Sequence, residues 1–166
     1  MRERSLWIRQ LESRSMRIVV LVGLPGSGKS TYLDGIGVPR LSSDAIRDLL
    51  ADDETDQTIH DRVFQTLRYL LRHRLAIGRP LTCIDATNLT PQERAPYIGI
   101  AKAYGCEVEA VFFDVPLEIC RQRNVGRSRV VPDDALSKMA AKLVPPSLEE
   151  GFSRVTVAPP FTAKSS

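Results

Sequence analysis

The residues from Gly23 to Thr31 have the types and the spacing needed to bind a polyphosphate. Gly23-Leu24-Pro25-Gly26-Ser27-Gly28-Lys29-Ser30-Thr31 matches the pattern G-x-x-x-x-G-K-S/T of a phosphate-binding loop. Glycines let such a loop adopt positive φ and point its N–H groups at phosphate oxygens. Lys29 is expected to reach the β- and γ-phosphates, and the Ser30 hydroxyl to bind Mg²⁺. The segment predicts a nucleoside triphosphate site and leaves the fate of the phosphate open.

A strand and a helix must hold this loop in place. The run Ile18-Val19-Val20-Leu21-Val22 comes directly before the loop, and its β-branched content predicts a buried strand. A helix is expected to start near Lys29, which adds its dipole and its unpaired N–H groups to the anion site. The order strand, loop, helix is the context in which this motif binds phosphate.

Asp44 is a second candidate for chemistry. It follows a short predicted strand, Val38-Pro39-Arg40-Leu41-Ser42-Ser43, and Arg47 lies three residues further on the same face of a helix. Two interpretations remain open. Asp44 is well placed to be the N-cap of that helix. Alternatively, because ligands of open α/β sheets lie beyond the carboxyl ends of the strands, Asp44 and Arg47 orient a hydroxyl and hold a nearby phosphate.

Asp85 is a third candidate, at the end of the apolar segment Leu81-Thr82-Cys83-Ile84-Asp85. A carboxylate at the tip of such a strand can hold Mg²⁺ through water, as the Walker-B aspartate does. The alternative is a turn residue in Asp85-Ala86-Thr87-Asn88. The direction of the strand favours the metal site.

Arginines gather at the end of a predicted helix that opens at Pro116 and runs from Leu117 to Asn124. Arg123 lies in its last turn, and Arg127 and Arg129 follow in the next loop. A solvated turn would explain them, but a phosphate loop in the same domain favours a lid. Arginines that close over a transferring phosphoryl group stabilise its charge, and a lid excludes water.

The other segments complete an alternation of strands and helices. Apolar residues spaced by three and four predict a helix from about Asp56 to Ile77. Thr90 and Glu93 form a capping-box pattern that starts a helix ending near Tyr104. Strands are expected at 107–114 and 152–157 and a helix at 132–143, so the chain is α/β. In the helix predicted from about Asp56 to Ile77, the face opposite the apolar stripe carries Arg62, Arg68, Arg72 and Arg74. We expect this face to be solvated; the alternative is that it contacts an anionic acceptor.

The length of 166 residues predicts a single domain. The net charge of +3 weakly favours an anionic partner. No stretch of apolar residues is long enough to span a membrane. The three cysteines lack C-x-x-C spacing, which indicates free thiols in a reducing cytoplasm. His60 and His73 lack metal-ligand spacing and receive no role. The expected domain covers 16–158. Residues 1–15 form an N-terminal extension, with Met16 as an alternative start, and 159–166 a flexible tail.

An ordered set of motifs carries a resemblance to polynucleotide 5′-kinases, over about Met16 to Val157. The chain resembles the kinase module of bacterial polynucleotide kinase-phosphatases and also the phage polynucleotide kinase. Besides the phosphate loop, the motifs are Ser42-Ser43-Asp44-x-x-Arg47, Asp53-Glu54-x-Asp56-Gln57, Asp85-Ala86-Thr87-Asn88-Leu89, Phe113-Asp114-Val115-Pro116 and Gln122-Arg123-Asn124.

The resemblance implies a P-loop kinase fold: a five-stranded parallel sheet in the order 2-3-1-4-5, flanked by helices, with an Arg-rich lid. It implies that the loop, including Lys29 and Ser30, binds ATP and Mg²⁺. It further implies that Asp44 is the general base facing a 5′-hydroxyl and that Arg47 contacts the neighbouring phosphate. Arg123 and Arg127 would bind the ATP phosphates, while Asp85 and Asn88 would shape the metal and acceptor sites.

These observations predict an ATP-dependent kinase, with the 5′-OH end of a polynucleotide as the expected acceptor. Two alternatives stay open. A kinase of the same fold could act on a small molecule such as a nucleoside, sugar or antibiotic, and a nucleotide-binding ATPase would need no acceptor at all. The pair of Asp44 and Arg47 disfavours the ATPase. The sequence leaves the oligomeric state open.

Overall fold

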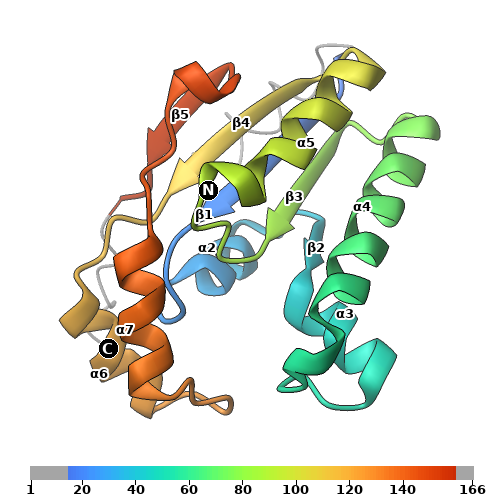
Figure 1. Ribbon diagram of the computed structural model, residues 1–166. Helices are drawn as coiled ribbons and strands as arrows, with labels where there is room; N and C mark the ends of the chain where they lie inside the picture. The colour runs from blue at the N-terminus through green and yellow to red at the C-terminus, as the bar shows by residue number, and fades with distance from the viewer. Residues whose placement is uncertain (1–14, 160–166) are drawn as a thin grey trace.

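The computed structural model describes residues 15–159, and the expectations for the extension before Ser15 and for the tail after Pro159 lie outside them. Strands and helices alternate along most of this range (Figure 1). The elements are β1 (Arg17–Val22), α2 (Lys29–Ile36), β2 (Arg40–Ser42), α3 (Ser43–Ala51), the 3₁₀ turn η1 (Gln57–Ile59), α4 (His60–Ala76), β3 (Leu81–Asp85), α5 (Pro91–Tyr104), β4 (Glu107–Phe112), α6 (Leu117–Val125), α7 (Asp133–Lys142), the 3₁₀ turn η2 (Leu148–Glu150) and β5 (Arg154–Val157).

The five strands form one parallel sheet in the order β2-β3-β1-β4-β5, as predicted. The register pairs Val20 of β1 with Ile84 of β3 and with Ala110 of β4. Every strand points the same way, so the carboxyl ends of β1, β2 and β3 lie at one edge of the sheet. The phosphate-binding loop follows β1, Asp44 follows β2 and Asp85 is the last residue of β3, so all three lie at the same edge.

Both faces of the sheet are covered, because alternate residues of β1 enter two different cores. Ile18, Val20 and Val22 pack with α4 and α5, and Val19 and Leu21 pack with Leu33 of α2. A strand buried on both faces has a continuous apolar sequence, which is why β1 has no polar alternation. A third core joins the phosphate-binding loop to α6 and α7. We call residues 117–142, which hold α6, α7 and the loop between them, the lid.

Most predicted helix boundaries are confirmed. Thr90 and Glu93 form the expected capping box, and Gly105 ends α5 in a left-handed conformation with φ 64°. The helix predicted from Asp56 is different: the Asp56 side chain accepts a hydrogen bond from the Thr58 N–H and begins η1, so the α-helix itself starts at His60. No helix within residues 15–159 is long and apolar enough to cross a membrane.

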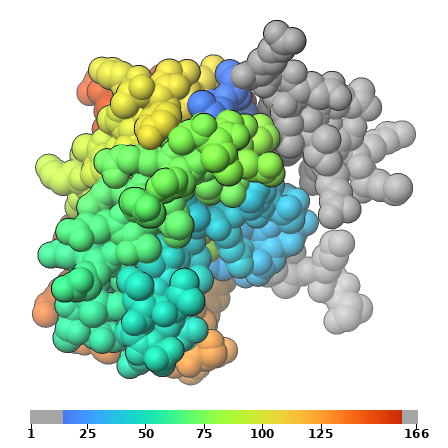
Figure 2. Space-filling view, turned by 90° about the vertical axis from the view of Figure 1, so that its right-hand side faces the viewer, coloured from blue at the N-terminus to red at the C-terminus, as the bar shows by residue number. Residues whose placement is uncertain are grey.

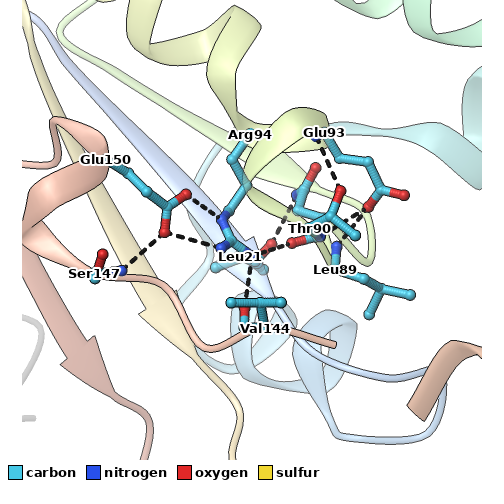
Figure 3. A network of polar contacts seen from close by, with 9 residues as sticks. Leu21, Leu89, Thr90, Glu93, Arg94, Val144, Ser147 and Glu150 are labelled. Carbon is cyan, nitrogen blue, oxygen red and sulfur yellow. Dashed lines mark hydrogen bonds and ion pairs between the residues drawn. The ribbon is translucent and has the colours of Figure 1, made fainter. Parts of the chain in front are cut away.

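A buried arginine ties the carboxyl edge of the sheet to the C-terminal part of the chain (Figure 3). Arg94 is fully buried, and its Nε and Nη2 donate to the two carboxylate oxygens of Glu150, at 2.8 and 2.9 Å. Its Nη1 donates to the carbonyl oxygens of Asn88 and Val144, each at 2.9 Å. The segment that follows the lid is therefore fixed to the loop that follows β3.

Candidate active site

One cavity of about 710 Å³ opens at the carboxyl edge of the sheet. It is lined by the phosphate-binding loop, the start of α3, the end of β3, the start of α4 and the lid. Most of the predicted site residues lie on its wall: Pro25, Gly26, Gly28, Lys29, Ser30, Thr31, Asp44, Arg47, Asp85, Arg123 and Arg127. Gly23 and Ser27 do not line it; they shape the loop from within, where their oxygens accept hydrogen bonds from Lys29.

The backbone of the loop requires glycine at two positions. Gly26 and Gly28 have φ values of 81° and 98°, in the left-handed region that side chains disfavour. At Gly26 a Cβ would also lie 2.9 Å from the Cys120 carbonyl oxygen of α6. Helix α2 begins at Lys29, so its first N–H groups, which have no partner inside the helix, point into the loop. This arrangement is a cradle for phosphate oxygens.

Lys29 is held at the centre of the cradle. Its Nζ donates to the carbonyl oxygens of Gly23 and Leu24, at 2.9 and 2.8 Å. Burial is the main cause that lowers the pKa of Lys29 to about 8; nearby Arg127 lowers it further and Asp85 opposes the shift. Two cations that face the same space repel each other, and an anion between them relieves that repulsion.

Ser30 and Asp85, the two residues predicted to hold a metal, contact each other directly. The Ser30 hydroxyl donates to Oδ2 of Asp85, at 3.1 Å. Burial raises the pKa of Asp85, while Lys29 and the Ser30 hydrogen bond act in the opposite direction. A hydroxyl and a carboxylate are oxygen donors of the kind that Mg²⁺ prefers, with phosphate oxygens and water as its other ligands. Within residues 15–159, no group of three or more His, Cys, Asp or Glu side chains could hold a metal by itself.

The lid brings guanidinium groups over the cradle. Arg123 donates from Nη1 to the Gly26 carbonyl oxygen, at 3.4 Å. Arg127 has a buried Nη1 without a hydrogen-bond partner in the described part of the chain. A buried donor without an acceptor is costly, so this atom fits a ligand with acceptor oxygens. The phosphates of a nucleoside triphosphate supply such oxygens.

Asp44 does not cap its helix. The N-cap of α3 is Ser42, whose hydroxyl accepts from the Ala45 N–H, and Asp44 lies in the first turn with its side chain on the cavity wall. Oδ1 of Asp44 accepts hydrogen bonds from Nη1 of Arg47, at 3.1 Å, and from Nη1 of Arg129. Among the described residues, no hydrogen bond reaches Oδ2. That oxygen is therefore open to a ligand in the cavity.

Asn88, which was expected to help bind an acceptor, does not line the cavity. The Asn88 side chain is buried, and its Nδ2 donates to the Leu21 carbonyl oxygen, at 2.7 Å, and to the Ala86 carbonyl oxygen, at 3.3 Å. Its backbone has φ 49°, a conformation that asparagine tolerates better than most residues. Asn88 thus fixes the turn after β3 from inside and does not line the cavity.

Three residues on the cavity wall were given no individual role from the sequence. Arg129 pairs with Asp44, and His60 and Phe64 also line the cavity. The two rings lie one helical turn apart on α4, with centroids 4.8 Å apart and planes tilted by 45°. The lid contributes mostly apolar lining residues: Val130, Val131, Pro132, Ala135 and Met139. The four-residue spacing of His60 and Phe64 is the signal that could have grouped them.

The AAA_33 family model, described as an AAA domain, matches residues 18–146. The chain belongs to the AAA_33 family. Within this family the chain is a P-loop kinase domain. The matched range contains the phosphate-binding loop, Asp44, Asp85 and the lid, so the whole cavity lies inside the family domain.

Relatives of this AAA_33 domain include kinases with nucleic-acid substrates in their names. A bifunctional polynucleotide phosphatase/kinase of Schizosaccharomyces pombe is 27% identical over 153 residues, which cover 89% of this chain and 35% of the relative. An L-seryl-tRNA(Sec) kinase of Methanococcus maripaludis is 21% identical, over 89% of this chain and 60% of the relative. The chain therefore spans about a third of one relative and less than two thirds of the other.

The solved structure of a Pnkp1/Rnl/Hen1 RNA repair complex has the same fold. It matches with a TM-score of 0.67 and 23% identity, over 78% of this chain and 44% of the other. At this identity the likeness extends to the fold alone.

Proposed function

We propose that this domain transfers the γ-phosphate of ATP to the 5′-hydroxyl end of a polynucleotide. The observation that carries the proposal is that a phosphate cradle and the carboxylate of Asp44 open onto one cavity. Asp44 is close enough to Lys29 and Asp85 to influence the pKa of both. A hydroxyl that bridges the cavity can therefore face the γ-phosphate and the carboxylate at once.

In the proposed reaction the hydroxyl oxygen forms a bond to the γ-phosphorus, and the bond from that phosphorus to the β–γ bridging oxygen breaks. The products are the phosphorylated acceptor and ADP, and the hydroxyl proton passes to Oδ2 of Asp44. A carboxylate with a reference pKa near 4 is a weak base at neutral pH. A weak base is sufficient here, because in a loose transition state the acceptor hydroxyl must first be oriented and loses its proton only late.

The remaining side chains act on charge and position. Lys29, Arg123 and Arg127 stabilise the charge that spreads over the phosphoryl oxygens. Ser30 and Asp85 would hold Mg²⁺, which supplies positive charge at the β- and γ-phosphates. Arg47, whose Nε is buried without a hydrogen-bond partner in the described residues, binds the phosphate next to the acceptor hydroxyl.

The nucleic-acid acceptor is supported by the position of Arg47 beside Asp44 and by the polynucleotide kinase named among the relatives. A small hydroxyl compound is the second candidate, because the aromatic rings of His60 and Phe64 and apolar side chains of the lid also line the cavity. An ATPase without an acceptor is disfavoured, since it has no use for a paired carboxylate facing the cradle.

The test is transfer from γ-labelled ATP with Mg²⁺ to a panel of 5′-OH oligonucleotides, nucleosides and sugars. We expect the label on the 5′ end of oligonucleotides, with matched 5′-phosphorylated oligonucleotides as the negative control. A nucleoside or sugar that is used far better than any oligonucleotide would overturn the acceptor. Release of labelled phosphate at the same rate with and without any acceptor would overturn the kinase.

A further inference from the structure

A groove of about 280 Å³ runs between α4 and α5, outside the cavity described above. Figure 2 shows this side of the molecule, where α4 lies at the surface in green with the yellow end of α5 beside it. Small side chains of α5 keep the groove open, and a Cβ added at Gly99 would meet nothing within 4 Å. Its lining includes Arg68, Arg72, Pro96, Gly99, Ala103 and Tyr104.

Positive charge in this groove is not compensated. Neither Arg68 nor Arg72 forms an ion pair or a hydrogen bond through its side chain with another residue of the range 15–159, and no carboxylate lines the groove. Arg74 of the same helix behaves differently, because its guanidinium donates to Thr82 Oγ1 and to the Leu81 carbonyl oxygen, each at 2.9 Å. Arg74 is structural, whereas Arg68 and Arg72 are free to bind an anion.

The groove and the cavity are both lined by helix α4. His60, Phe64, Arg68 and Arg72 recur every four residues and form one ridge along α4. The first two line the cavity and the last two line the groove. From Phe64 to Arg72 the helix rises about 12 Å, roughly the rise of three to four nucleotides in a nucleic-acid strand.

We propose that Arg68 and Arg72 bind backbone phosphates of the acceptor strand, on the 3′ side of the nucleotide that enters the cavity. This inference rests on the proposed function and extends it from a strand end to a strand of several nucleotides. A nucleic-acid strand fits because it presents regularly spaced phosphates, and guanidinium groups bind phosphate oxygens well. The half-exposed ring of Tyr104 at the edge of the groove offers a surface on which a base can stack.

The test compares a 5′-OH dinucleotide with a single-stranded 5′-OH 12-mer of the same base composition. The variant is Arg68→Ala/Arg72→Ala. The matched control is Arg62→Ala/Arg79→Ala, which removes the same charge from exposed residues that line neither the groove nor the cavity. We expect kcat/KM of the groove variant to fall about tenfold for the 12-mer and less than twofold for the dinucleotide. The salt dependence of 12-mer binding should weaken by roughly 0.7 log units per log unit of salt for each arginine.

Unchanged dinucleotide activity also shows that the groove variant is folded. A 12-mer to dinucleotide preference that is the same in the wild type and the groove variant would overturn the inference. An equal loss in the control variant would overturn it too, since general charge would then explain the effect. If the wild type phosphorylates no oligonucleotide, the proposed function itself is refuted. If it phosphorylates both lengths, and the Arg68→Ala/Arg72→Ala variant keeps the same preference for the 12-mer over the dinucleotide, only the inference about the groove is refuted.

Discussion

Arg129 of the lid donates a hydrogen bond to Oδ1 of Asp44, at the start of α3. The contact connects two segments 85 residues apart in the chain across the mouth of the cavity. Arg47, three residues further along α3, donates to the same oxygen, at 3.1 Å. Neither arginine contacts Oδ2, so this oxygen is the one that can accept a proton. Arg129 reaches the carboxylate from the lid.

Arg129→Ala should therefore lower kcat more than it raises KM for ATP. Without Arg129 the half-exposed Asp44 carboxylate loses one of the two groups that orient it, and we expect a loss of about tenfold in kcat, or about 1.4 kcal/mol. Arg129→Lys, which keeps the charge, should recover part of the loss. Steady-state kinetics with a 5′-OH oligonucleotide measures this. A kcat within twofold of the wild type in Arg129→Ala would show that the ion pair has no part in positioning Asp44.

Arg47→Ala should weaken the use of the oligonucleotide more than the use of ATP. Arg47 is buried beside Asp44 and its Nε has no partner in the described part of the chain, so a substrate phosphate is its expected acceptor. Loss of a hydrogen bond to a charged group should raise KM for the oligonucleotide about tenfold or more. The measurement is KM for each substrate at saturation of the other, with the unfolding temperature as a check on folding. An equal rise in both KM values would move Arg47 out of the acceptor site.

Asp85→Asn should raise the Mg²⁺ concentration needed for half-maximal activity. The amide keeps the shape of the side chain and removes the negative charge next to Ser30. We expect a shift of roughly tenfold or more, comparable to the loss when groups around a metal are changed. Asp34→Asn is the matched control, because Asp34 also pairs with Arg40 but lies outside the cavity. Identical Mg²⁺ titrations for wild type and Asp85→Asn would exclude Asp85 from the metal site.

Arg94→Ala should destabilise the fold. The substitution leaves Glu150 without its partner and removes a donor from two carbonyl oxygens in a buried network (Figure 3). Breaking a buried ion pair from one side costs about 3–5 kcal/mol, which corresponds to a fall of roughly 10 °C in Tm for a domain of this size. Thermal unfolding followed by circular dichroism measures the change. The exposed Arg62→Ala should stay within about 0.5 kcal/mol of the wild type, and an equal shift in both variants would contradict the role of Arg94.

The positions of the strands and helices agree with the sequence because the signals for them are local. The apolar run of β1, the capping box of α5 and the glycine that ends α5 each act within a few residues of their own position. The order 2-3-1-4-5 came from the family resemblance. Asp44 and Asp85 could be placed at the same edge of the sheet from the sequence, because Asp44 follows β2, Asp85 ends β3, and parallel strands end at one edge.

What the sequence missed depends on contacts between distant segments. The lid has three arginines in the seven-residue stretch 123–129. Which arginine contacts which residue depends on how α6 and α7 pack: Arg129 contacts Asp44 and Arg123 contacts Gly26. The sequence could not place Asn88 inside the protein, because a polar residue after a strand can face either a ligand or the protein. Its positive φ and its hydrogen bond to Leu21 depend on the neighbouring strand β1.

The most direct measurement is the single-turnover rate of Asp44→Asn with saturating ATP, Mg²⁺ and a 5′-OH oligonucleotide, together with the Kd for ATP in the same preparation. Loss of a general base is expected to slow transfer roughly 10²–10⁴-fold, with the Kd for ATP nearly unchanged because Asp44 lies outside the phosphate cradle. Transfer by Asp44→Asn within a few-fold of the wild-type rate would show that the carboxylate facing the cradle does not take part in the reaction.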